Sequence, residues 1–125
     1  MGLPPQQVPL CEQIGRENLE AVIEKFYQRL LADAVLGAYF RAIPDLDAHR
    51  QRFIEFWWIG MGGENPNPPA IDMVGKHEGL GLAATDFNRW AGLFAETAHE
   101  LLDAAQAEAW IRMAHVAIHR LRAIQ

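Results

Sequence analysis

One amphipathic pattern dominates this chain of 125 residues: NLEAVIEKFYQRLLA at residues 18–32. Its apolar positions recur at the spacing i, i+3, i+4, i+7 and i+8, which places them on one face of an α-helix. These positions are Leu19, Val22, Ile23, Phe26, Tyr27, Leu30 and Leu31. The pattern therefore predicts a helix from Asn18 to Ala32 that buries this face in a core.

The same periodicity predicts three further long helices. The first runs from about Leu46 to Met61, and its apolar stripe consists of Phe53, Phe56, Trp57 and Gly60. The second has Thr85 as its N-cap and a stripe of Phe87, Trp90, Phe94 and Leu101. The third begins at Asp103, with Gln106 at capping-box spacing, and its stripe consists of Trp110, Met113, Ala117 and Leu121. No segment alternates as a strand does, so the predicted fold class is all-α, with an N-terminal extension at residues 1–17 and one domain at 18–125.

Composition narrows the function classes. Half of the residues are hydrophobic and four are tryptophans, which is typical of a globular domain. The net charge of -5, with no basic and aromatic stretch, disfavours nucleic acid as a partner. No apolar run is long enough for a bilayer, and MGLPPQQVPL does not resemble a secretory signal, so we expect a soluble cytoplasmic protein. Cys11 is the sole cysteine, which excludes an intrachain disulfide and a thiolate cluster.

The centre of the chain contains an irregular stretch, GGENPNPPAID at residues 62–72. Its glycines, prolines and asparagines predict a loop, and long loops in small domains often serve a site. One or two turns of helix are expected from Ala70 to His77. Taken alone, His77 is either a structural histidine held by hydrogen bonds or a metal ligand.

Polar groups interrupt the apolar stripes at three places. Tyr27, His49 and Trp90 each permit two interpretations, a core group with a satisfied hydrogen bond or a polar group in a ligand pocket. Together with His77 and the aromatic side chains, they match the profile of an apolar pocket with few polar groups. The other candidate pair, His115 and His119, has helical spacing but no accompanying carboxylates, which favours two surface histidines over a metal site.

Three stretches carry a family resemblance: FYQRLLADAVLGAYF (26–40), HRQRFIEFW (49–57), and His77 followed by DFNRWAGLF (86–94). From Asn18 onward the chain resembles the group III truncated haemoglobins. The resemblance implies a shortened globin fold in which helices pack two over two around haem b. It implies His77 as the proximal iron ligand, Tyr27 as the distal hydrogen-bond donor, His49 as the distal histidine, Trp90 as the pocket indole and Phe40 on the haem face. The other residues expected to line the haem are Phe26, Phe53, Trp57 and Phe94.

The function implied is binding of dioxygen and of other diatomic ligands, NO and CO, at a pentacoordinate iron. Two donors near a bound ligand slow its release, which suits tight oxygen binding or the detoxification of nitric oxide or peroxide with an external reductase. We also expect a backbone carbonyl or water to hold the second ring nitrogen of His77. The alternatives are a haem-free helical sensor or interaction domain, and a carboxylate-bridged metal bundle, for which the paired glutamates are missing.

Overall fold

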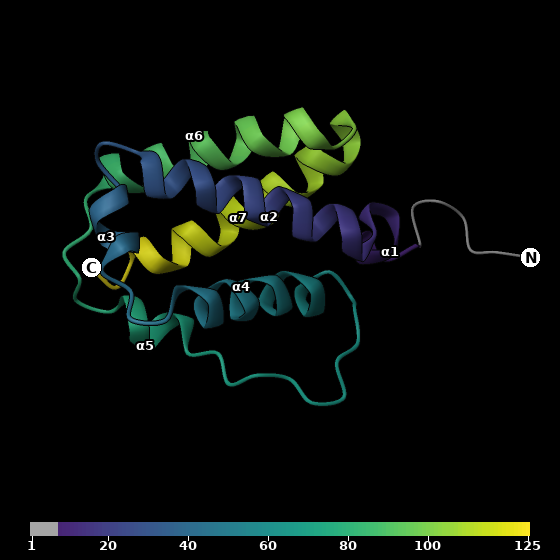
Figure 1. The fold of residues 1–125 in the computed structure, drawn as a ribbon, viewed down its shortest axis with the longest axis horizontal. Helices are drawn as coiled ribbons and strands as arrows, with labels where there is room; N and C mark the ends of the chain where they lie inside the picture. The colour runs from purple at the N-terminus through teal and green to yellow at the C-terminus, as the bar shows by residue number, and fades with distance from the viewer. Residues whose placement is uncertain (1–7) are drawn as a thin grey trace, which may run out of the picture.

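The computed structural model describes residues 8–125, the side chain of Val74 excepted. These residues form helices and no strand, which confirms the predicted all-α class (Figure 1). The helices are α1 (Leu10–Ile14), α2 (Arg16–Ala32), α3 (Gly37–Arg41), α4 (Leu46–Gly60), α5 (Met73–His77), α6 (Ala84–Leu101) and α7 (Ala104–Arg122).

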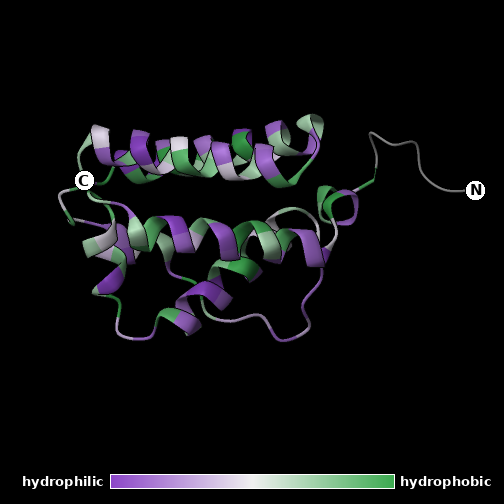
Figure 2. Ribbon diagram, turned by 45° about the horizontal axis from the view of Figure 1, so that its top comes forward, coloured by the Kyte–Doolittle hydropathy of each residue, from purple (hydrophilic) through white to green (hydrophobic). Residues whose placement is uncertain are grey.

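Helix α2 is the centre of the core, as its sequence pattern predicts. It starts two residues earlier than expected, after Gly15, whose φ of 84° ends α1 and turns the chain. Its apolar face is buried, with only Leu31 partly exposed, and packs on both α4 and α6. Figure 2 shows hydrophobic and hydrophilic residues alternating around the helices, which is the pattern that lets each helix bury only one face.

Helices α6 and α7 form the second pair. They are antiparallel neighbours, and the rings of Phe94 and Trp110 meet edge to face at 5.1 Å between centroids. Asp103 caps α7 as predicted, because its Oδ1 accepts a hydrogen bond from the Gln106 N–H at 2.8 Å. The Gln106 side chain does not close the capping box; it donates to the Gln13 carbonyl at 3.0 Å. The two pairs, α2 with α4 and α6 with α7, give the two-over-two arrangement predicted for the chain.

One local prediction was wrong. Thr85 is not the N-cap of α6: the helix begins at Ala84, and Asp86 accepts a hydrogen bond from the Ala83 N–H at 2.9 Å. A carboxylate in the first turn therefore fixes the helix start in place of the threonine hydroxyl. The connection after α2 also contains a short helix, α3, which the sequence pattern does not predict.

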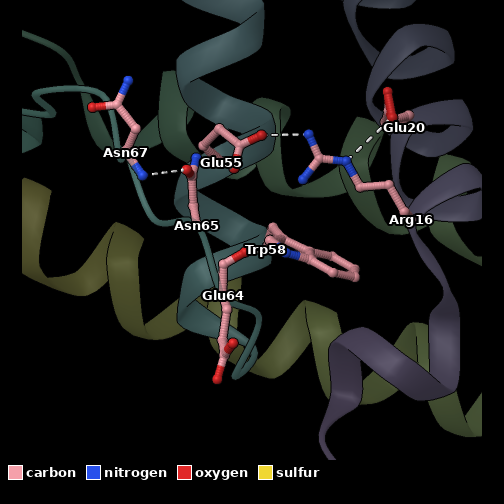
Figure 3. Close-up of polar contacts among 7 residues, drawn as sticks. All are labelled: Arg16, Glu20, Glu55, Trp58, Glu64, Asn65 and Asn67. Carbon is pink, nitrogen blue, oxygen red and sulfur yellow. Dashed lines mark hydrogen bonds and ion pairs between the residues drawn. The ribbon is translucent and has the colours of Figure 1, made fainter.

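The first part of the long loop after α4 is hydrogen-bonded to that helix (Figure 3). Glu55 accepts hydrogen bonds from the Arg16 guanidinium on one side and from the Asn65 side-chain amide, at 3.0 Å, on the other. The Trp58 indole N–H donates to the Glu64 carbonyl at 3.3 Å. A Cβ atom on Gly63 would lie 2.4 Å from Trp58 Nε1, so this turn requires glycine. The loop then returns along the molecule to α5.

The structure describes part of the predicted N-terminal extension, residues 8–17 of 1–17. Residues 1–7 lie outside the described part, whereas α1 packs on α2 and α7 and buries Cys11 and Ile14. Among residues 8–125, no helix combines the length and hydropathy that a bilayer crossing requires.

Candidate functional site

Tyr27 and His49 form a polar pair inside the apolar region between α2 and α4. The Tyr27 hydroxyl oxygen lies 2.8 Å from His49 Nδ1. Tyr27 is only 4% exposed, and its ring packs against Phe40 and Phe53 at centroid distances of 6.1 and 5.6 Å. The hydroxyl that the sequence places in an apolar stripe therefore has a partner, and that partner is the candidate distal histidine.

Burial sets the protonation of this pair. Burial raises the pKa of Tyr27, against the smaller opposing effects of Arg50 and Arg52. Burial also lowers the pKa of His49, and repulsion from Arg52, and from His77 in its charged form, lowers it further. Near neutral pH both side chains are therefore uncharged. The hydrogen bond between them can then run from the Tyr27 hydroxyl to His49 Nδ1, or from His49 Nδ1–H to the Tyr27 oxygen.

His77, half-buried at the end of α5, has one nitrogen fixed and one available. Its Nδ1 lies 2.6 Å from the carbonyl oxygen of Met73, one helical turn earlier. A carbonyl only accepts, so Nδ1 carries a proton, and in the neutral ring the lone pair is on Nε2. This confirms the expectation that a backbone carbonyl holds one ring nitrogen.

Aromatic side chains surround the polar pair. Trp90 of α6 meets Phe26 edge to face at 5.0 Å and Phe53 at 6.3 Å. Phe53 in turn meets Trp57 at 5.8 Å. Of the residues predicted to line the pocket, Phe40, Phe53 and Trp90 are half-buried, whereas Phe26, Trp57 and Phe94 lie within the closed core.

A cavity of about 230 Å³ adjoins this aromatic cluster between α4, α5 and α7. Phe56 and Trp57 line it from α4, Met73 from α5, and Met113 from α7. Trp57 also has a buried indole N–H without a hydrogen-bond partner among the described residues. The α5 side of the core therefore has both space and an unused donor.

The remaining histidines do not belong to the site. His99, His115 and His119 are exposed on α6 and α7, as expected for surface residues. Within residues 8–125, no three His, Cys, Asp or Glu side chains are grouped to hold a metal ion.

Comparison with known families agrees with this geometry. Residues 9–122 match the family model for bacterial-like globins. The chain belongs to that family.

Among similar proteins, this globin is 34% identical to the group 1 truncated hemoglobin GlbN of Mycolicibacterium paratuberculosis over 82 residues. That match covers 66% of this chain and 59% of the relative. It aligns with the 2/2 hemoglobin of Synechococcus sp. PCC 7002, a structure with covalently attached heme, at a TM-score of 0.80 and 22% identity, covering 91% of this chain and 98% of that one.

Two further structures extend the comparison. The group III truncated hemoglobin of Campylobacter jejuni aligns at a TM-score of 0.76 and 22% identity, covering 90% of this chain and 92% of that one. The truncated hemoglobin of Tetrahymena pyriformis aligns at 0.73 and 25% identity, covering 91% and 94%. Because the named relatives include both group 1 and group III, the matches establish a truncated globin and not its group.

Haem is the cofactor that this family implies, and the donor set fits it. A haem iron needs one neutral imidazole with a free lone pair, and His77, whose Nδ1 is engaged by the Met73 carbonyl, would supply it from Nε2. The porphyrin needs apolar and aromatic walls, which the half-buried rings of Phe40, Phe53 and Trp90 would supply. The sequence did not single out Met73, although its position four residues before His77 on one helix is the signal for the carbonyl contact.

Proposed function

We propose that this globin holds haem b through His77 and binds dioxygen, and also NO and CO, with the iron's sixth position open to the ligand. The observation that carries the proposal is the bond from His77 Nδ1 to the Met73 carbonyl, because it directs the free Nε2 away from its own helix. When bound, haem supplies an iron that takes up diatomic molecules reversibly.

Tyr27 is the group that stabilises such a ligand in this proposal. Its hydroxyl is buried at 4% exposure and protonated, so it can donate one hydrogen bond. If His49 carries its proton on Nδ1, the Tyr27 oxygen accepts from His49 while its own O–H turns to the ligand. His49 then orients the tyrosine and controls access, and Trp90 adds a second donor from α6.

We also propose membership of group III. What supports it is the set Tyr27, His49 and Trp90 together with the Phe56–Trp57 pair on α4, which are the residues that carried the resemblance. The physiological role that follows is tight oxygen binding or the detoxification of nitric oxide or peroxide in the cytoplasm, with an external reductase.

The test is haem titration of the wild type and of two histidine variants. His77→Ala is expected to lose stoichiometric haem or to bind it with altered coordination, because no group beside it on α5 replaces the imidazole. His115→Ala, which removes an exposed histidine of α7, is the control and should match the wild type. An unchanged iron–histidine stretching band in His77→Ala would refute the assignment.

A further inference from the structure

The short helix that carries His77 needs support from outside itself. Helix α5 has five residues, and a helix of this length is not stable alone in water. The ring of His77 is bonded to the Met73 carbonyl within the same helix. Whatever holds the backbone of α5 therefore also sets the direction of His77 Nε2.

Gln125 supplies that support from beyond the end of α7. Its Nε2 donates to the His77 carbonyl at 2.9 Å and to the Leu121 carbonyl at 3.0 Å, and its Oε1 accepts from the Leu82 N–H at 3.1 Å. An amide side chain has two N–H donors and one acceptor oxygen, and all of them are engaged. Exchanging O and N would break all three contacts, so the geometry fixes the orientation of the amide.

The contact with His77 is the functional part of this arrangement. The last carbonyls of a helix have no partner within the helix, and an exposed end frays. Gln125 satisfies the carbonyl of His77 itself, across 48 residues of chain. It acts as a C-terminal cap for α5 that comes from the segment after α7.

Neighbouring contacts fasten the same segment. The Gly79 N–H donates to the Ile124 carbonyl at 3.3 Å. Met73 and Leu82, which flank His77, pack against a small hydrophobic cluster of Phe87, Ile118 and Leu121. Figure 1 shows the C-terminal end of the chain beside α5. The chain is thus held on both sides of His77 by the end of α7 and the residues that follow it.

We infer that Gln125 is a positioning residue for His77: its amide clips the end of α5 and the following turn to α7 and so fixes the direction of His77 Nε2. We call the three hydrogen bonds of the Gln125 amide, to His77, Leu121 and Leu82, the clip; the structure contains all three. Its role toward iron rests on the proposed function.

The experiment compares Gln125→Met, which keeps the length of the side chain and removes both donors, with Gln106→Met. Gln106 is a matched control, because it is a glutamine that also donates to a distant backbone carbonyl, that of Gln13, and this contact does not involve α5. In the haem-free protein, amide hydrogen exchange at Gly79 and Leu82 should speed up about fivefold or more in Gln125→Met, the loss expected for one or more hydrogen bonds. Gln125→Glu also lacks the donors but keeps an oxygen that accepts from the Leu82 N–H, so exchange should speed up at Gly79 more than at Leu82. Gln106→Met should change neither amide.

The haem-loaded protein tests the positioning role. In Gln125→Met the iron–histidine stretching band should shift or broaden and haem should dissociate about fivefold faster, whereas the carbon monoxide stretching band, which reports on the Tyr27 side, should stay unchanged. Unchanged exchange at Gly79 and Leu82, or an equal change in Gln106→Met, would overturn the clip. Faster exchange with an unaltered iron–histidine band would overturn the positioning role. If the wild type takes up no haem, the proposed function fails, and the exchange data still decide on the clip.

Discussion

At the scale of single residues, the hydrogen bond between Tyr27 and His49 decides how the pocket meets a ligand. We expect Tyr27→Phe to release oxygen about tenfold faster or more, because a hydrogen bond to a partly charged ligand is worth roughly 1.5–3 kcal/mol. His49→Leu should have a smaller effect, since the Tyr27 hydroxyl remains and loses only its partner. The measurement is the oxygen dissociation rate of the ferrous protein by stopped flow.

The chain offers a matched control for this substitution. Tyr39 is the second tyrosine, and it is 48% exposed on α3. Tyr39→Phe removes the same hydroxyl from a solvated position and should leave oxygen release unchanged. A larger effect of His49→Leu than of Tyr27→Phe would show that the histidine, and not the tyrosine, is the principal donor.

At the scale of elements, Asp33 joins the end of α2 to α6. Its carboxylate accepts hydrogen bonds from the Val35 and Leu36 N–H groups and from Arg89 Nε, the last at 2.7 Å. Only 6% of its side chain is exposed. The hydrogen bond from Arg89, followed by those from the backbone N–H groups, holds the pKa of Asp33 well below its usual range. The helix that carries Tyr27 is thereby fixed to the helix that carries Trp90.

A depressed carboxyl pKa makes this junction sensitive to acid. The unfolded chain has an ordinary Asp pKa near ~3.9, so the stabilisation is complete above that value and is lost as the pH falls toward the lower folded pKa. We expect the free energy of unfolding of the wild type to fall more between pH 6 and about pH 3 than that of Asp33→Asn. Urea unfolding at both pH values measures this difference. Asp47→Asn, at a side chain that is 84% exposed, should keep the full wild-type pH response.

The elements also show why some of the structure could be predicted and some could not. A stripe of seven apolar residues fixes α2 because each of them needs burial, and no other conformation puts all of them on one face. The start of α6 was misplaced because Thr85 and Asp86 are both capping residue types, and only the position of the Ala83 N–H decides between them. Helix α3 was missed because five residues carry too little periodicity to detect.

At the scale of the whole molecule, the site consists of contacts between residues far apart in sequence. The stripes predict that Tyr27 and His49 lie on buried helix faces, but they do not predict that the two side chains meet across 22 residues. The bond between Gln125 and His77 leaves no trace in any local pattern. The sequence therefore predicts the residue types of the site and the helix faces on which they lie. Its hydrogen-bonded pairs, in contrast, depend on how α2, α4, α5 and α7 are placed in space.

The whole chain also bears on whether it can sustain a reaction by itself. Nitric oxide that reacts with the oxygen-loaded protein would leave the iron ferric, so each further turnover needs one electron. A nucleotide-binding unit would place a glycine-rich loop between a strand and a helix. GLGLAA at residues 79–84 approaches that motif, but it follows α5, and residues 8–125 contain no strand. We therefore predict that this 125-residue chain consumes about one equivalent of nitric oxide and then stalls in the presence of NADH alone.

The measurement is nitric oxide consumption at an electrode, with purified protein and NADH, before and after an NADH-dependent reductase is added. Addition of the reductase should restore continuous consumption, and a blank with reductase and NADH but no globin should stay flat. Tyr27→Phe should shorten the lifetime of the oxygen-loaded form in the same assay, because faster oxygen release competes with the reaction. Many turnovers by the purified chain with NADH alone would contradict the prediction, and they would mean that electrons reach the iron by a route that the described helices do not provide.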